Sequence, residues 1–199
     1  MYLNIFVFTL YFFIQYFIPQ IQHVQIFDEN LIIVNQRIDA FYSKLKINEI
    51  KKLKNTTAKI FFDSNGGILK YGYDIILIMD KVKKNNVIFE CYALNARSIS
   101  FDIFQRCDVR YTTPNSHLMQ HEASVNYDLD ALVDIIDSGF FEEYKIINDS
   151  LDKYASKKAN ISFWTYKKLI KNELRLYGYD ILKHKFSDKV VIIDDILLI

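Results

Sequence analysis

The chain has 199 residues, of which 51% are hydrophobic and 25% are charged, and its net charge is +1. This length suffices for one domain with a sizeable core and is too short for two comfortable ones. Nucleic-acid-binding proteins usually carry a basic surface, and the sequence has no long run of Lys and Arg. We therefore expect no nucleic-acid partner.

The first 20 residues differ in composition from the rest of the chain. Residues 1–20 contain no charged residue, and their apolar part ends at Pro19. This length lies between the apolar segment of a signal peptide, roughly 7–15 residues, and a membrane-spanning helix of about 20. A signal peptide, a signal anchor and an aromatic-rich core helix all stay open as interpretations. We expect a hydrophobic leader over 1–20 that directs the chain to the membrane or the secretory pathway and could attach it there, followed by a folded domain over 26–199.

Apolar segments and segments with helical spacing alternate along that domain. Strands are expected at residues 30–38, 58–64, 86–94, 108–113 and 116–123, with a turn at Pro114–Asn115, and at 189–199. Helices are expected at residues 47–55, 69–84 and 98–106 and over most of 128–174. The segment 58–64 is continuously apolar, which is typical of a strand buried on both faces of a parallel sheet. The alternation predicts an α/β fold built from βαβ units.

Three of the five glycines, Gly66, Gly67 and Gly72, lie where the strand at 58–64 gives way to the next helix. Such a junction presents free N–H groups and the positive end of the helix dipole. The phosphate-binding patterns GxxxxGK[ST] and GxGxxG are absent. The other use of such groups is to hold the oxyanion of an acyl-transfer reaction, which also requires a nucleophile and a base.

Two later segments could supply these groups. The segment "NARSISF" places Ser98 and Ser100 between a strand and a helix, and "PNSHLMQHEAS" places His117 and His121 on a strand. Taken alone, each pattern is weak, because a serine at a helix start is most often an N-cap and a strand histidine is usually structural.

The order of these segments resembles a known family. The run from "IFFDSNGGILKYGYDI" through "ALNARSIS" to "VRYTTPNSHLMQH" is similar to the proteolytic subunit of Clp protease and to the wider Clp-protease/crotonase-like fold. The resemblance covers about residues 30–192, and its most specific part runs from Pro114 to His121, with Arg110, Asp180 and Asp188 also matched. It implies a stack of βαβ units with a C-terminal helical segment and a closing strand.

The resemblance also implies an activity and the residues that perform it. The chain would be a serine endopeptidase that forms an acyl-enzyme on Ser98, with His121 as general base. The backbone N–H groups of Gly67 and Ile99 would form the oxyanion hole, and residue 67 would be glycine because its backbone must face the reacting carbonyl. The substrate would be a peptide or an unfolded protein, and stacked rings in the family imply a homo-oligomer.

The catalytic acid departs from the family pattern. An ungapped match puts Leu169 where the family has its aspartate, and leucine can neither orient a histidine nor stabilise imidazolium. Glu173 lies one helical turn further on the same face and is the first candidate for the acid. Glu122 and Asp152 are alternatives.

Other departures keep further functions open. Leu94 replaces a family glycine, Arg97 places a long cation before the nucleophile, and residues 122–130 replace a glycine-rich segment. Ser100 would be the nucleophile if the register shifts by two. A second hypothesis is a catalytically degenerate scaffold or binding protein. A third is a crotonase-like acyl-CoA enzyme, for which we find no set of carboxylate and cationic groups.

The two cysteines, Cys91 and Cys107, could pair in an oxidising compartment. Two buried free thiols are the default interpretation, and the spacing indicates no metal site. We expect no metal and no cofactor.

Overall fold

The computed structural model describes residues 22–26, 29–123 and 140–194. In these residues seven strands form one sheet in the order β1-β7-β5-β4-β3-β2, with β6 beside β5. The pairs are parallel except for β5 and β6, which are antiparallel. The strands are β1 (Gln22–Val24), β2 (Leu31–Val34), β3 (Thr57–Ser64), β4 (Ile88–Arg97), β5 (Val109–Gln120), β6 (Leu174–Tyr177) and β7 (Lys189–Ile193).

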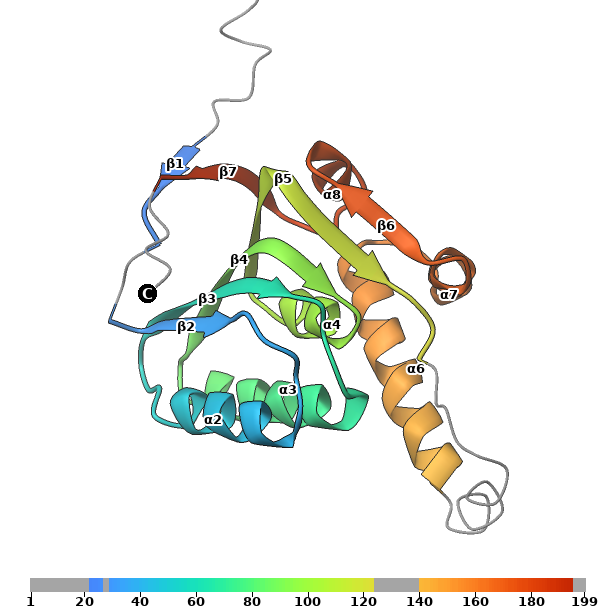
Figure 1. The fold of residues 1–199 in the computed structure, drawn as a ribbon, viewed down its shortest axis with the longest axis horizontal. Coiled ribbons are helices and arrows are strands. Elements are labelled where there is room, and N and C mark those ends of the chain that lie inside the picture. The colour runs from blue at the N-terminus through green and yellow to red at the C-terminus, as the bar shows by residue number, and fades with distance from the viewer. Residues whose placement is uncertain (1–21, 27–28, 124–139, 195–199) are drawn as a thin grey trace, which may run out of the picture.

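The helices are α2 (Ala40–Ile50), α3 (Leu69–Lys83), α4 (Ile99–Gln105), α6 (Phe140–Lys158), α7 (Phe163–Lys171) and α8 (Tyr179–Lys183). Helices α2, α3 and α4 lie on one side of the sheet (Figure 1). This mixed architecture confirms the α/β prediction. The predicted leader at 1–20 lies outside the described residues. In the part of the chain that is described, no helix is long and apolar enough to span a bilayer.

The main core lies between the sheet and its helices, and β3 shows why the sequence predicts it well. Ile60 and Phe62 point into this core, while Phe61 joins a second cluster on the opposite face with Tyr92 and Tyr111. The two tyrosine rings stack with centroids 4.5 Å apart. Strand β3 is therefore buried on both faces, as its unbroken apolar run predicts.

Helix α3 agrees with its predicted range, whereas α2 begins earlier than expected. The periodic apolar residues of α3 are all buried: Leu69, Ile75, Ile76, Met79 and Val82. The prediction of a helix over 47–55 is wrong at both ends. Helix α2 starts at Ala40 because the Asp39 carboxylate accepts a hydrogen bond of 2.9 Å from the Tyr42 N–H and so caps the first turn.

Strand β5 is one continuous strand, so the predicted turn at Pro114–Asn115 is wrong. Thr112 pairs with Ala93 and His117 pairs with Asn95, so β5 bulges between these two positions. Pro114 has no N–H to donate to the ladder. The Ser116 hydroxyl donates to the Ala93 carbonyl over 2.5 Å and so supplies the missing contact to β4. The bulge lets β5 continue alongside the end of β4, which brings His121 close to the β4–α4 junction.

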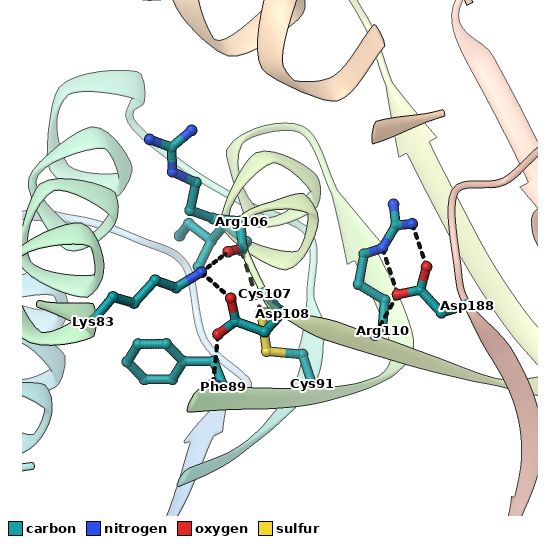
Figure 2. The surroundings of a disulfide bond; sticks show 9 residues. Lys83, Phe89, Cys91, Arg106, Cys107, Asp108, Arg110 and Asp188 are labelled. Carbon is teal, nitrogen blue, oxygen red and sulfur yellow. Dashed lines mark hydrogen bonds and ion pairs between the residues drawn. A yellow bond between two sulfur atoms is a disulfide. The ribbon is translucent and has the colours of Figure 1, made fainter. Parts of the chain in front are cut away.

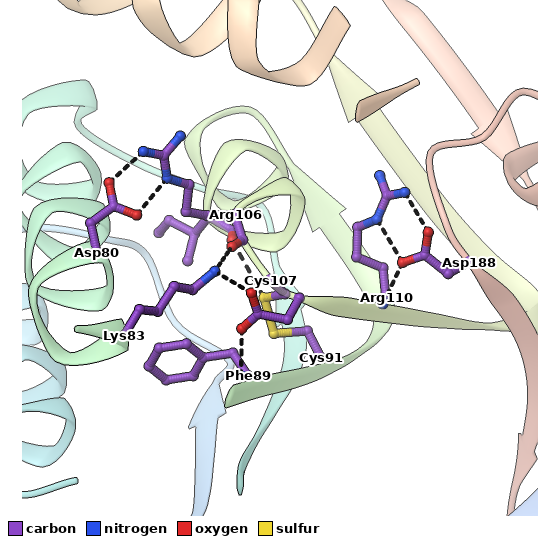
Figure 3. A network of polar contacts seen from close by, with 10 residues as sticks. Asp80, Lys83, Phe89, Cys91, Arg106, Cys107, Arg110 and Asp188 are labelled. Atoms are coloured by element: carbon purple, nitrogen blue, oxygen red, sulfur yellow. Dashed lines mark hydrogen bonds and ion pairs between the residues drawn. A yellow bond between two sulfur atoms is a disulfide. The ribbon is translucent and has the colours of Figure 1, made fainter. Parts of the chain in front are cut away.

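A disulfide joins Cys91 on β4 to Cys107 at the end of α4, so the default interpretation of free thiols is wrong. Figure 2 shows polar contacts that hold the chain just after α4 in place. Lys83 of α3 donates to the Arg106 carbonyl and to the Asp108 carboxylate, and Asp108 also accepts the N–H of Phe89. The C-terminal end of α4 is therefore fixed to both α3 and β4, and Figure 3 adds the Arg106–Asp80 ion pair to this network.

Arg110 and Asp188, which the resemblance matched, have a structural role. Arg110 is 2% exposed. Its backbone N–H and the Nε and Nη2 groups of its side chain all donate to the Asp188 carboxylate (Figure 3). Burial alone would raise the pKa of Asp188, but the hydrogen bonds and charge of Arg110 outweigh it and lower that pKa. The pair fixes the start of β7 to the start of β5.

Candidate active site

Two strand-to-helix junctions, β3–α3 and β4–α4, meet at one edge of the sheet. Gly66 has a φ of +88°, and a Cβ there would overlap the Arg97 carbonyl and lie 3.0 Å from the Ser98 Cβ. A Cβ on Gly72 would overlap the Ile99 side chain. The clustered glycines therefore allow the two junctions to touch.

Gly67 is fixed against the chain that follows β2. The Ile38 N–H donates to the Gly66 carbonyl over 2.9 Å, and the Ile68 N–H donates to the Ile38 carbonyl over 2.8 Å. In this parallel pattern the N–H of Gly67 points away from Ile38, toward the β4 side. A Cβ on Gly67 would overlap the Ile38 backbone. This close approach requires glycine here, and it is a different reason from the one expected from the sequence.

Ser98 occupies a sharp turn between β4 and α4. Its φ is 52° and its ψ −132°, a region that residues with a Cβ rarely adopt. Although it is the N-cap residue, its side chain makes no capping hydrogen bond. A turn of this kind presents the hydroxyl outward instead of directing it to the helix N-terminus. Ile99 is the first helical residue, where an N–H without an intrahelical partner is expected.

His121 lies just beyond β5 and is brought to Ser98 by the backbone. The Ser98 N–H donates to the Met119 carbonyl over 2.9 Å, two residues before His121. Nδ1 of His121 lies 2.7 Å from the Glu122 carbonyl oxygen. Because a carbonyl only accepts hydrogen bonds, this Nδ1 carries the proton and Nε2 is left with its lone pair. The ring is therefore held as the tautomer that a general base requires.

These groups share one cavity of about 550 Å³, which Ser98, His121, Gly66, Gly67 and Ile99 line together. In the described structure no hydrogen bond joins the Ser98 hydroxyl to the His121 ring. Catalytic hydrogen bonds are often long before substrate binds. Apart from the acid, all the residues predicted for catalysis and for the oxyanion hole therefore line this cavity: Ser98, His121, Gly67 and Ile99.

The structure does not bring Glu173 to the histidine. Its carboxylate accepts two hydrogen bonds from Arg175, the shorter 2.6 Å, and it does not line the cavity. Leu169 is 40% exposed on α7 and does not line the cavity either.

The alternative acids are also engaged elsewhere. Asp152 accepts a hydrogen bond of 3.0 Å from Lys167. The Glu122 carboxylate lies 3.6 Å from the same ammonium group. In the described residues, no carboxylate hydrogen-bonds to His121, and the Glu122 backbone carbonyl occupies that position.

The remaining candidates lie outside the cavity. Ser100 is fully buried within α4. His117 accepts a hydrogen bond of 2.7 Å from Arg97 and stacks on Tyr177, with ring centroids 4.3 Å apart. Burial, and then the charges of Arg97 and Arg175, lower the pKa of His117. Arg97 therefore bonds to His117 instead of placing its charge beside the Ser98 hydroxyl.

Asp102 lines the cavity as well, and sequence reasoning missed it. It is 5% exposed, and one carboxylate oxygen accepts a hydrogen bond of 2.7 Å from Gln120. Burial, and then the charge of Asp152, raise the pKa of Asp102 well above its usual range, although the bond from Gln120 acts against them. The signal in the sequence was a carboxylate in the first turn of the helix that follows Ser98.

This fold is that of the Clp protease family. The family model of that name, Clp protease, matches residues 20–193, and the chain belongs to this family. Among solved structures, a mutant of ClpP1 from Listeria monocytogenes is similar, with a TM-score of 0.70, 13% sequence identity and coverage of 83% of this chain and 93% of that chain. At this identity the match shows the shared fold. No curated protein matches the chain.

Proposed function

We propose that the chain is a serine peptidase that cleaves peptides or unfolded proteins through an acyl-enzyme. The observation that carries this proposal is the turn at Ser98. The turn leaves the hydroxyl uncapped in a cavity that it shares with the His121 imidazole, whose Nδ1 lies against the Glu122 carbonyl. A serine at the N-cap position without a catalytic role would be expected to cap its helix.

The mechanism follows from these positions. Nε2 of His121 accepts the Ser98 proton while Oγ attacks the peptide carbonyl carbon. The N–H groups of Gly67 and Ile99 hydrogen-bond to the resulting oxyanion. His121 then gives the proton to the departing amine as the C–N bond breaks. In the second half, His121 deprotonates a water molecule that attacks the ester and releases Ser98.

The Glu122 carbonyl takes over only part of the role of a catalytic acid. It fixes the ring orientation and the tautomer, as a carboxylate would. It carries only a partial charge, so it stabilises imidazolium less. Replacing the acid of a trypsin-type triad lowers turnover by about 10⁴-fold. We therefore expect slow turnover compared with peptidases that have a complete triad.

A fluorophosphonate probe tests the nucleophile directly. The folded wild-type protein should be labelled, Ser98→Ala should lose the label and Ser100→Ala should keep it. Label that persists in Ser98→Ala, or a folded wild-type protein that no such probe labels, would overturn the proposal.

A catalytically degenerate scaffold is the second candidate, because no described carboxylate hydrogen-bonds to His121. It is favoured if His121→Ala leaves the rate of probe labelling unchanged, since the imidazole would then not activate the serine. A serine peptidase requires that rate to fall steeply.

We further propose that the chain assembles into a homo-oligomer and that residues 1–20 lead it to the membrane or the secretory pathway. Exposed apolar side chains on α2, Phe41 and Leu45, support assembly, because they lie one turn apart and face solvent in the single chain. The disulfide supports passage through an oxidising compartment.

A further inference from the structure

The cavity beside Ser98 has a polar, acidic region that the proposed chemistry does not use. We propose that this region is a subsite for a cationic side chain of the substrate, Lys or Arg, and that Asp102 is the residue that selects it. The proposal rests on the proposed peptidase function, because it names the substrate of the same site.

The position of Asp102 carries the first step. Asp102 lies in the first turn of α4, directly after the turn at Ser98. Side chains on a helix lean toward its N-terminus, which is the end that Ser98 occupies. Asp102 lines the same cavity as Ser98 and His121. A substrate side chain next to the attacked carbonyl therefore has Asp102 within its reach.

The unpaired oxygen of Asp102 carries the second step. Its Oδ2 accepts the hydrogen bond from Gln120, while Oδ1 is buried and has no partner among the described residues. A buried acceptor without a donor destabilises the folded protein. An ammonium or guanidinium group in the cavity would supply the missing donor and neutralise the carboxylate.

The surrounding charges decide between a cation and a neutral donor. Arg37 and Asp63 line the cavity together with Asp102. Asp152 and Glu122 lie nearby, and Lys167 contacts them both, so the carboxylates outnumber the two cations. Asp149 adds a further negative charge to the field at Asp152. The charge of Asp152 also acts on Asp102 and opposes its ionisation in the empty site. A substrate cation reverses that balance, so the field favours Lys or Arg over Gln or Asn.

Two phosphonate inhibitors that differ only in charge test the subsite. A peptidyl diphenyl phosphonate with a lysine side chain next to phosphorus should label wild-type Ser98 about tenfold or more faster than its norleucine analogue, because norleucine lacks the charged donor. Asp102→Asn should reduce this preference to about twofold or less. Asp149→Asn is the matched control, since it removes a nearby carboxylate that does not line the cavity, and it should keep the preference.

A glutamine-like phosphonate separates the charge from the hydrogen bond, and it should react more slowly than the lysine form. Equal rates for lysine and norleucine, or an undiminished preference in Asp102→Asn, would overturn the subsite. If an uncharged fluorophosphonate still labels Ser98 in that case, the peptidase proposal survives alone.

A binding measurement keeps the two proposals separate if Ser98 proves unreactive. Butylammonium chloride should raise the unfolding temperature of the wild type and of Asp149→Asn above that in sodium chloride, and should not do so for Asp102→Asn. The same shift, or none, in all three proteins would remove the cation subsite without reference to catalysis.

Discussion

At the scale of single residues, two features of the site lower the stability of the folded protein: the backbone conformation of Ser98 and the buried carboxylate of Asp102. The φ and ψ of Ser98 lie in a region that is costly for any residue with a Cβ. Asp102 is buried, and one of its oxygens has no hydrogen-bond partner among the described residues. Features that cost stability in this way concentrate at functional sites.

Glycine usually lowers the stability of a folded protein, but the strain at Ser98 predicts that glycine raises it at this position. Ser98→Gly should raise the free energy of unfolding by about 1 kcal/mol, because glycine adopts this backbone conformation without strain, although its greater freedom in the unfolded chain offsets part of the gain. Urea denaturation of the two proteins measures the difference. Ser100→Gly, inside α4, is the control and should lower stability. A loss of stability in Ser98→Gly would mean that the turn is not strained.

The raised pKa of Asp102 predicts a stability difference that depends on pH. Between the pKa of the unfolded chain, about 3.9, and the higher pKa of the native protein, only the native state keeps the proton, so stability falls as pH rises, by up to about 1.4 kcal/mol per unit. Asp102→Asn removes this loss. In urea denaturation the unfolding free energy of the variant relative to the wild type should increase as the pH rises above about 4, and the two should show the same pH dependence below it. A constant offset at every pH would contradict the assignment.

At the scale of elements, the site depends on how β4 and α4 are held together. The disulfide (Figure 2) joins residues 16 positions apart. The loop that it closes contains Ser98. The bonds from Lys83 and Phe89 secure the same end of α4. Ser98 therefore lies between two anchored ends, Cys91 before it and Cys107 after it.

Loss of this disulfide should lower both stability and reactivity. The double variant Cys91→Ala/Cys107→Ala should lose about 3 kcal/mol of unfolding free energy, as expected for a loop of this length. It should also react more slowly with a fluorophosphonate, because the turn is less firmly held. A reductant should weaken the wild type and leave the double variant unaffected. A wild type that is insensitive to reductant under denaturing conditions would show that the cysteines are thiols.

At the scale of the whole molecule, the exposed apolar residues of α2 predict an interface between copies of the chain. A homo-oligomer should cover Phe41 and Leu45, so light scattering should give a mass that is a multiple of the single chain. Phe41→Glu/Leu45→Glu should reduce that mass, because two buried charges oppose association. Ile146→Glu, at an equally exposed apolar position on α6, should leave it unchanged. A monomeric wild type would contradict assembly.

Much of the fold is legible in the sequence because its signals are local. The apolar run of β3, the periodicity of α3 and the strand–glycine–helix order depend on neighbouring residues, and each was predicted correctly. Element boundaries were predicted less well. Helix α2 starts earlier than expected because Asp39 caps it, and β5 has a bulge, with a Ser116 hydrogen bond to β4, where a turn was predicted. The order of three segments, of which the stretch from Pro114 to His121 is the most specific, indicated the family, and the match over residues 20–193 confirms it.

The sequence by itself determined the order of strands and helices, the positions of Ser98 and His121 within that order, and the presence of a glycine junction. Only the tertiary structure decided that Cys91 pairs with Cys107, that Glu173 bonds to Arg175, and that Asp102 faces the cavity. The physical reason is range: periodicity and turn chemistry act over a few residues. Hydrogen bonds, burial and charge depend on which distant segments the sheet brings together, and no local pattern encodes that.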